Sequence, residues 1–232
     1  ELKFLTWNVN GLGHKIKRGL VTRVVNRYGA DVVFLQETHM VDKQHESFSK
    51  GKNKVVNFAH FSSGSRAVLT LVRKSVAFHI TKRWGNTKGC YTAVQGDWEG
   101  ETIILINIYA PPGLQAQTLQ DIGRLLVEMP PALTILGGDM NLVLNSEMDR
   151  TSAKPEGTAT LGKLGNFMEA LGLVDVWRES HDKLKAYSYH SGAHDVSSRQ
   201  DYFLMPGNTA HRFTDARYLA RGITDHSPLE MT

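Results

Sequence analysis

The sequence has almost no cysteine. Its 232 residues contain one, Cys90, so the chain can form no internal disulfide and has too few thiols for a zinc ribbon or an iron–sulfur cluster. Such sparse cysteine usage is typical of the reducing cytosol and nucleus. No apolar run approaches the about 20 residues that a membrane helix needs, and residues 1–9 lack the basic region and apolar core of a signal peptide. We therefore expect neither a disulfide scaffold nor a membrane protein.

The sequence also has only a small excess of charge of one sign. The formal net charge is +4 and the sequence pI about 9.1, which permits a phosphate-bearing partner without requiring one. A hydrophobic content of 41% in 232 residues is enough for a substantial core. The chain contains no internal repeat, no low-complexity tract and no linker, and this predicts one domain over residues 1–232.

Short β-rich runs alternate with helical patterns along the chain. Apolar residues at intervals of three and four predict helices over residues 15–28, 115–128 and 161–171. Alternating or continuous apolar runs predict strands over residues 2–9, 31–36, 67–73, 76–82, 91–97, 102–109 and 133–136. The polar stretch 144–160 is expected to be a loop. β-α units on either side of a β-meander predict a layered α/β domain.

Several predicted strands end in polar residues. The segments concerned are WNVNG (7–11), LQET (35–38), NIYAP (107–111), GGDMN (137–141), DYFL (201–204) and TDHSP (224–228). Singly, each has a simpler explanation: Asn8 as a turn former, Asp139 as a helix cap, His226 as a surface histidine. As a set they supply what metal-assisted phosphate hydrolysis requires, namely hard oxygen ligands, a histidine that can accept a proton from water, and hydrogen-bond donors for a phosphate.

The six segments, in this order, resemble the endonuclease/exonuclease/phosphatase superfamily, which includes pancreatic deoxyribonuclease and the abasic-site endonucleases. The resemblance extends from Leu2 to Leu229. Within the superfamily the chain resembles the endonuclease domain of LINE-type retrotransposons, through KFLTWNVNGL, LQETH, GGDMNLVLNSEMDR, DVWR and YSYHSGAHDVSSRQDYFL. This resemblance implies a four-layer α/β sandwich, in which two facing mixed β-sheets carry helices on the outside.

The resemblance also implies roles for eight residues. Glu37 would be the main Mg²⁺ ligand, with Asn8 and Asp225 beside it and Mn²⁺ as an alternative ion. His226 would act as the base, oriented by Asp201. The residues around the scissile phosphate would be Asp139, Asn141 and Tyr109, with Asp139 either positioning water or protonating the leaving oxygen. The product would be a DNA nick with a 3′ hydroxyl.

Four further residues match DNA-contacting positions of the retrotransposon enzymes, namely Arg150, Ser188, Arg199 and Thr224. Residues 189–200 match a hairpin that enters the minor groove, although Gln200 replaces an apolar residue there. The simpler alternative for this segment is a solvated loop without a partner.

The implied partner is double-stranded DNA. A fused reverse transcriptase would extend the 3′ hydroxyl, and the domain would act as a monomer on chromosomal DNA in the nucleus after synthesis in the cytoplasm. One alternative is an abasic-site repair endonuclease, which would prefer a lesion. A second is a non-catalytic DNA-binding module, which would be expected to lack part of the polar set.

Overall fold

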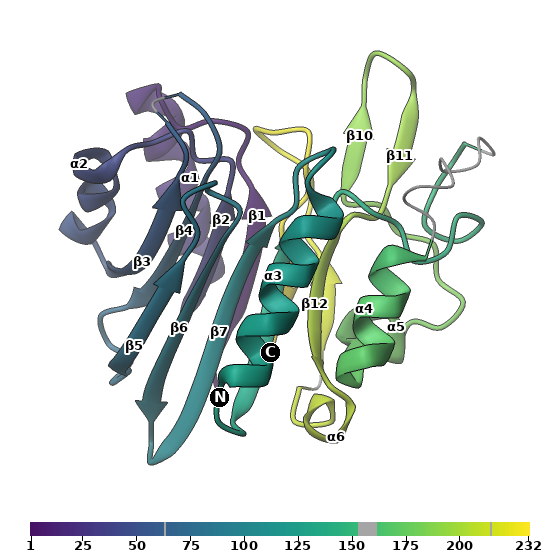
Figure 1. Cartoon of the computed structure of the whole chain (residues 1–232). Coiled ribbons are helices and arrows are strands. Elements are labelled where there is room, and N and C mark those ends of the chain that lie inside the picture. Colours follow the sequence, from purple (N-terminus) through teal and green to yellow (C-terminus); the bar gives the residue numbers. More distant parts are fainter. Residues whose placement is uncertain (63, 153–161, 214) are drawn as a thin grey trace.

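Two six-stranded mixed β-sheets face each other in the computed structural model, which describes residues 1–62, 64–152, 162–213 and 215–232 (Figure 1). The first sheet has the order β13 (Ala216–Tyr218), β14 (Leu229–Met231), β1 (Phe4–Asn8), β2 (Val32–Gln36), β4 (Ala67–Arg73) and β3 (Asn53–His60). The second has the order β5 (His79–Gly85), β6 (Tyr91–Trp98), β7 (Glu101–Tyr109), β8 (Leu133–Asp139), β12 (Asp201–Pro206) and β9 (Leu173–Asp175).

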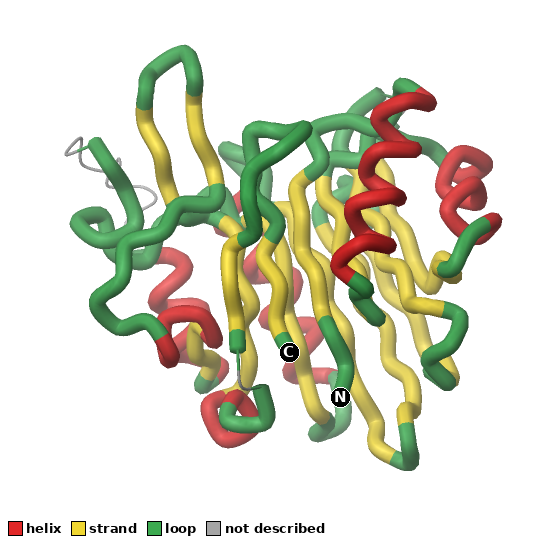
Figure 2. The backbone as a smooth tube through the Cα atoms, turned by 180° about the vertical axis from the view of Figure 1, so that it is seen from behind, coloured by secondary structure: helices red, strands yellow, loops and turns green. Residues whose placement is uncertain are grey.

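Helices cover the outer faces of both sheets, which confirms the predicted four-layer sandwich (Figures 1 and 2). The first sheet carries α1 (Lys15–Tyr28), α2 (Asp42–His45) and a 3₁₀ turn, η1 (Glu46–Lys50). The second carries α3 (Gln115–Glu128) and α4 (Lys163–Leu171). The short helices α5 (Val176–Ser180) and α6 (Gly207–Ala210) lie beside β9 and β12 and contribute Val176, Trp177 and Ala210 to the central core. No helix of the described residues is both long and apolar enough to span a bilayer.

Helix α1 shows how the sequence sets these elements. The His14 side chain accepts a hydrogen bond from the Ile16 amide at the amino end, and Gly29 closes the helix in the left-handed region at φ 68°, which costs glycine little. Val21 and Val25 are buried in one cluster with β1 and β2. The spacing of four between them places both on one face, and their burial holds the helix on the sheet.

The two inner sheet faces form the central core. Aromatic rings from both sheets meet there, with the Phe34 and Phe203 centroids 6.3 Å apart. Polar contacts also cross the core. Gln36 Nε2 donates to Asn107 Oδ1 at 2.8 Å, and Asn107 Nδ2 donates to the Leu35 and Leu69 carbonyls. A buried hydrogen bond of this kind is costly to break, so it fixes β2 of one sheet against β7 of the other.

Parallel pairing brings distant residues to one edge. β1 pairs in parallel with β2, and β7 in parallel with β8, so the carboxyl ends of these strands all lie at the upper end of the sandwich in Figure 1. Gly138 in β8 makes the β7–β8 approach possible: at φ +147°, a Cβ there would lie 1.9 Å from the Ile108 carbonyl oxygen. Residues that follow these strands are therefore candidates for a shared site.

The structure corrects several predicted boundaries. The strand predicted at 76–82 is β5, shifted to His79–Gly85 because the backbone turns after Arg73. β3 was not predicted at all, and β8 continues through two glycines to Asp139. In the predicted loop, residues 144–152 contain no helix or strand beyond one bridge from Arg150 to Ser198; the remainder, and residue 161 of the predicted third helix, lie outside the described residues.

Candidate active site

The side chain of Asn8 connects the two sheets at the upper end of the sandwich. Its Nδ2 donates to Glu37 Oε1 at 2.9 Å, in the first sheet, and to Asp139 Oδ2 at 2.8 Å, in the second. Its Oδ1 accepts from the Asn10 amide at 2.9 Å. The side chain is buried, so these three hydrogen bonds fix its orientation. Three residues singled out in separate motifs are thereby brought together.

Glu37 is held in an unusual backbone conformation. It follows β2 with φ 50°, a region that residues other than glycine seldom occupy. Its carboxylate remains 22% exposed, with Oε2 3.4 Å from His39 Nε2. Burial raises the pKa of the neighbouring Tyr109 above its usual value, and Glu37 and Asp139 raise it further. Tyr109 therefore stays a neutral hydroxyl that can donate a hydrogen bond.

His226 lies between two buried carboxylates. Its Nδ1 is 2.8 Å from Asp201 Oδ2, and its Nε2 is 3.8 Å from Asp139 Oδ2. Asn141 holds Asp139 in place, because the Asn141 amide donates to Oδ1 at 2.9 Å and its Nδ2 to Oδ2 at 3.2 Å. An imidazole whose Nδ1 is fixed by a carboxylate presents Nε2 in one direction, and here that direction is toward Asp139.

This trio retains a proton near neutral pH. Burial lowers the pKa of His226, but the carboxylates of Asp201 and Asp139 raise it more, so the net shift is upward. Burial and the charge of Asp201 raise the pKa of Asp139. Since both pKa values are raised, His226 and Asp139 together hold a proton near neutral pH that can be given to or taken from a reacting oxygen.

Asp225 joins the site through two residues that the motif analysis did not assign to it. Asn10 Nδ2 donates to Asp225 Oδ1 at 3.2 Å, and Lys17 Nζ donates to the Asn10 carbonyl at 2.7 Å. Burial lowers the pKa of Lys17, while Asp225 and Glu37 act in the opposite direction. Lys17 therefore lies within electrostatic reach of both carboxylates. The sequence alone does not reveal this role, because Asn10 has the pattern of a turn residue and Lys17 is one of several basic residues on a predicted helix.

The donors of this site suit a divalent cation. Hard ions such as Mg²⁺ prefer carboxylate and amide oxygens, and Glu37 and Asp225 present partly exposed carboxylates. Asp139, Asp201 and His226 also place ligand atoms within 4.8 Å of one another. Those three are buried and already bonded to neighbours, so the side of Glu37 and Asp225 is the more accessible place for an ion.

A family model described as "Endonuclease/Exonuclease/phosphatase family" matches residues 5–226. The chain belongs to this family. It is 25% identical over 232 residues to the "Transposon TX1 uncharacterized 149 kDa protein" of Xenopus laevis, a match covering 97% of this chain but only 18% of that protein. It is 26% identical over 260 residues to the exodeoxyribonuclease of Bacillus subtilis (strain 168), with 99% of this chain and 98% of the relative covered.

Solved structures show the same fold. The AP endonuclease LMAP of Leishmania major has a TM-score of 0.80 at 20% identity, covering 99% of this chain and 86% of that one. An AP endonuclease of Archaeoglobus fulgidus has a TM-score of 0.79 at 21% identity, covering 100% of this chain and 99% of that one. The domain is thus a nuclease-family protein related to a transposon protein, with the fold of AP endonucleases.

In this family member, two of the four residues expected to contact DNA lie in the interior. Ser188 is buried, and its Oγ accepts hydrogen bonds from the Gln200 and Asp201 amides at 2.9 and 3.0 Å. Arg199 is also fully buried. The structure therefore does not support direct DNA contact by either side chain. Ser188 instead stabilises the amino end of β12, whose first residue is Asp201.

Arg199 makes a buried ion-pair network. Its Nε and Nη2 lie 2.8 and 3.1 Å from the two oxygens of Asp149, and its Nη1 lies 2.5 Å from Asp175 Oδ2. Arg178 approaches Asp149 at 2.6 Å. The Arg199 guanidinium also stacks over the Trp177 ring at 5.1 Å. This network joins the loop after β8, helix α5 and the segment before β12.

The other two expected DNA contacts lie closer to the site. Thr224 Oγ1 accepts from the His226 amide, and its single hydroxyl hydrogen has the His226 carbonyl at 2.9 Å and the Asn8 carbonyl at 3.2 Å within reach, so Thr224 lies between two catalytic candidates. Arg150 is half-buried and forms a bridge with Ser198. These contacts within the protein do not test binding to DNA, so DNA contact by Thr224 and Arg150 remains a prediction.

A two-stranded hairpin rises beside His226. β10 (Tyr189–Ser191) and β11 (Val196–Ser198) pair in antiparallel fashion, and the hairpin projects from the upper end in Figures 1 and 2. The Tyr189 ring lies 4.9 Å from that of His226, and the His190 amide donates to the Asp225 carbonyl at 3.1 Å. The hairpin predicted within residues 189–200 is thus confirmed, and its base contacts the site directly.

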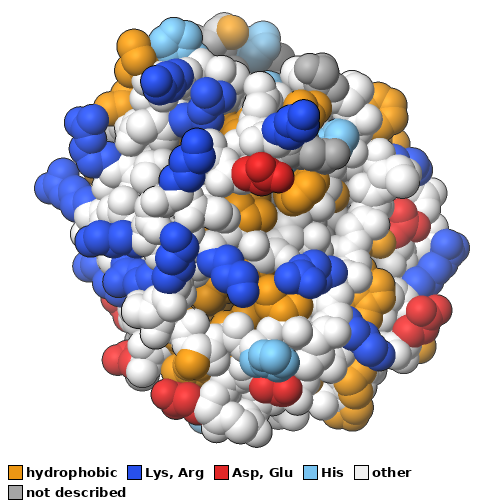
Figure 3. Space-filling model, turned by 90° about the vertical axis from the view of Figure 1, so that its left-hand side faces the viewer, with side chains coloured by type: hydrophobic (Ala, Val, Ile, Leu, Met, Phe, Trp, Pro, Cys, Tyr) orange, Lys and Arg blue, Asp and Glu red, His pale blue; other side chains and the backbone are white. Residues whose placement is uncertain are grey.

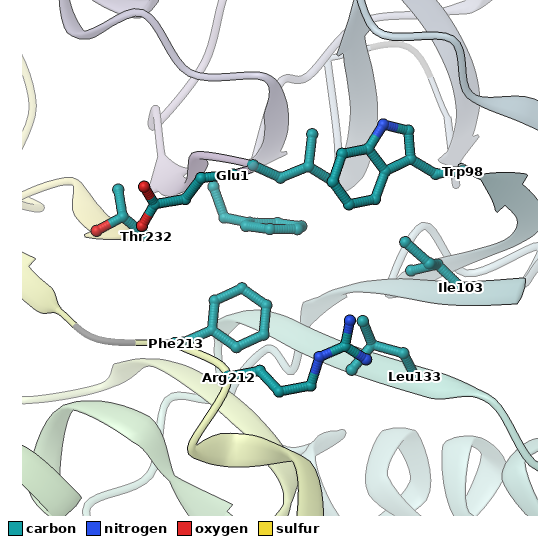
Figure 4. A pocket seen from close by; sticks show the side chains of 9 residues that line it. Glu1, Trp98, Ile103, Leu133, Arg212, Phe213 and Thr232 are labelled. Atoms are coloured by element: carbon teal, nitrogen blue, oxygen red, sulfur yellow. The ribbon is translucent and has the colours of Figure 1, made fainter. Parts of the chain in front are cut away.

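A cavity of about 340 Å³ lies away from these residues, at the opposite end of the sandwich (Figure 4). Its lining is mostly apolar and includes Phe4, Trp98, Ile103, Leu133 and Phe213, together with Glu1, Leu2, Arg212 and Thr232. It contains no set of groups suited to proton transfer, and it plays no part in the candidate site.

Proposed function

We propose that this domain is a Mg²⁺-dependent endonuclease that nicks double-stranded DNA and leaves a 3′ hydroxyl for priming of reverse transcription. One observation carries the proposal: Asn8 links Glu37 to Asp139, and Asp139 faces a histidine that Asp201 orients. A carboxylate open to an ion and a buried proton-transfer pair thus lie side by side, as hydrolysis of a phosphodiester requires.

The protein's own groups can divide the chemistry among them. A divalent ion, Mg²⁺ or Mn²⁺, held by Glu37 with Asn8 and Asp225 would neutralise charge that develops on the phosphate. His226 exchanges a proton at Nε2, while Asp201 keeps its ring in one orientation. Asp139 exchanges a proton with the departing or attacking oxygen, steadied by Asn141. Tyr109 donates a hydrogen bond to a phosphate oxygen that becomes more negative in the transition state.

The surroundings of the site favour a duplex over a small phosphate ester. The hairpin extends beyond the sheets next to His226, and its exposed or half-exposed residues include Ser191, Gly192 and His194. Such a projection has no use on a sugar or lipid phosphate but can follow a groove of DNA. Relationship to a transposon protein supports a role in retrotransposition, in a longer chain with a reverse transcriptase, on chromosomal DNA in the nucleus.

Nicking of a supercoiled plasmid tests the proposal. We expect the wild-type protein to convert it to the open circle with Mg²⁺, and a DNA polymerase to extend the nick directly from its 3′ hydroxyl. His226→Ala and Glu37→Ala should each abolish detectable nicking while the circular dichroism spectrum stays that of the wild type. Lys183→Ala, at an exposed residue outside the site, serves as the matched control.

Two results would contradict the proposal. Near-normal nicking by either variant would refute the catalytic role assigned to that residue. Nicking that persists in EDTA would refute the dependence on a metal ion. Incision of matched oligonucleotides with and without an abasic site separates this function from lesion repair: strong preference for the abasic strand would favour a repair endonuclease.

A further inference from the structure

Basic residues are concentrated in the first part of the chain. Residues 1–100 contain sixteen Lys and Arg against seven Asp and Glu, whereas residues 101–232 contain eleven against sixteen. The modest net charge of the whole chain hides this asymmetry. Figure 3 shows the side of the sandwich on the left of Figure 1, where Lys and Arg side chains outnumber acidic ones across the surface.

The edges of the two sheets meet on this side. β3 is the last strand of the first sheet and β5 the last strand of the second. Arg83 Nε in β5 donates to the Val56 carbonyl in β3 at 2.6 Å, and Asn57 Nδ2 donates to the Trp84 carbonyl at 2.7 Å. A cleft of about 330 Å³ lies at this junction, lined by residues 57–60 and 83–87. We refer to it as the edge cleft.

The edge cleft combines aromatic rings with cations. Its walls include Phe58, His60, Arg83 and Trp84. At the end nearer the strand termini lies Phe61, which is 53% exposed and has the Arg66 guanidinium 4.5 Å from its ring centroid. Stacking surfaces next to positive charge are the features by which proteins hold single-stranded nucleic acid without regard to sequence.

Lysines extend the basic surface along the strands. Lys54 in β3 and Lys82 in β5 are both exposed, and neither forms an ion pair with an acidic side chain of the described residues. Edge-strand lysines also prevent two sheets from pairing edge to edge. That function requires charge alone and does not account for an exposed aromatic ring and a cleft at the same place.

We propose that the edge cleft, with Lys54, Lys82 and Phe61, binds a single-stranded segment of nucleic acid. Its phosphates would contact the basic side chains and its bases would stack on the aromatic ones. This goes beyond the proposed nicking activity. A duplex is the less suitable occupant, because under the proposed function the duplex to be cut would lie across the ends of the strands while the edge cleft runs along them, and DNA is stiff over about 150 base pairs.

Fluorescence anisotropy with labelled oligonucleotides tests this proposal. The probes are oligo(dT) and oligo(rU) of about 12 nucleotides, within the usual site size of such proteins, in EDTA so that no strand is cut. Each phosphate contact to a single strand contributes about fivefold in affinity near 0.1 M salt. We therefore expect Lys54→Ala/Lys82→Ala to weaken binding about 25-fold and to reduce the slope of log K against log salt by about 1.4.

Two further variants sharpen the test. Phe61→Ala should weaken binding about fivefold or more through lost stacking, and it should leave the salt slope unchanged. Arg124→Ala/Lys163→Ala removes two positive charges from α3 and α4 on the other side of the molecule and should bind as the wild type does. The ratio of the two probes shows whether DNA or RNA is the preferred strand.

Plasmid nicking separates this proposal from the proposed catalytic function. Lys54→Ala/Lys82→Ala should nick within about twofold of the wild type, and His226→Ala should bind the oligonucleotides normally. Equal loss in the two double variants, unchanged binding by Lys54→Ala/Lys82→Ala, or an effect of that variant on a duplex alone would overturn the edge-cleft proposal. So would aggregation of that variant with normal oligonucleotide binding, which would assign the lysines to edge protection.

Discussion

Replacing Arg199 by methionine tests whether this arginine contacts DNA or holds the interior together. The side chain is fully buried, and Arg199→Met leaves the Asp175 carboxylate without its 2.5 Å partner. Asp149 keeps Arg178 at 2.6 Å, so one uncompensated buried charge remains. Removing one partner of a buried ion pair costs about 3–5 kcal/mol. For a domain of this size that corresponds to a fall in Tm of roughly 6–20 °C.

The pH dependence of this loss adds a second measurement. Burial raises the pKa of Asp175, and Arg199 opposes that rise, so the variant should raise it further. A carboxyl group whose pKa is higher in the folded than in the unfolded state favours folding while protonated and loses that contribution as pH rises. The stability difference between the variant and the wild type should therefore be larger at pH 8 than at pH 5.

Urea unfolding at both pH values, alongside DNA binding, provides the assay. Asp175→Asn in the Arg199→Met background should recover part of the lost stability, because it removes the uncompensated charge. Arg221→Met, at an exposed residue near the hairpin, is the control and should leave stability within about 0.5 kcal/mol. A loss below about 1 kcal/mol for Arg199→Met, together with weaker DNA binding and a smaller salt slope, would refute the structural role.

Three other results are expected. Tyr109→Phe removes one hydrogen-bond donor from the site and should lower nicking by about 10²–10³; an unchanged kcat on plasmid would exclude Tyr109 from the reaction. Gly138→Ala places a Cβ 1.9 Å from the Ile108 carbonyl oxygen and should cost about 3 kcal/mol or more, whereas Gly123→Ala, which meets no atom within 4 Å, should be tolerated in the same thermal scan. Mg²⁺ should raise the Tm of the wild type by binding the folded state but not that of Glu37→Gln, and equal shifts in both would place the ion elsewhere.

The sequence predicts the three longest described helices, α1, α3 and α4, because their periodicity is strong. The predicted ranges 15–28 and 115–128 coincide with α1 and α3, since each buries a regular apolar face. β3 carries asparagine, lysine and histidine at the edge of a sheet and buries only part of its length, so it lacks an apolar pattern. The boundary of β5 depends on backbone turns after Arg73 that local composition does not specify.

Family motifs predict which residues gather at the site but not how each side chain is used. Asn8, Glu37, Asp139, Asp201 and His226 lie together as expected. Arg199 and Ser188 also belong to matching segments, yet burial turns their side chains inward. A linear pattern carries no information about the direction of a side chain when the partners, here Asp149 and Asp175, come from other segments.

The Asn8 amide joins Glu37 on one sheet to Asp139 on the other at the site itself, and this has a consequence for how the site responds to mutation. Glu37 belongs to one sheet and Asp139 to the other, so the separation of ion ligand and proton carrier depends on the thickness of the central layer. Swapping Phe34 or Phe203 for a smaller residue would alter that spacing from a distance. Turnover, as well as thermal stability, should thus be sensitive to hydrophobic residues that never touch the substrate.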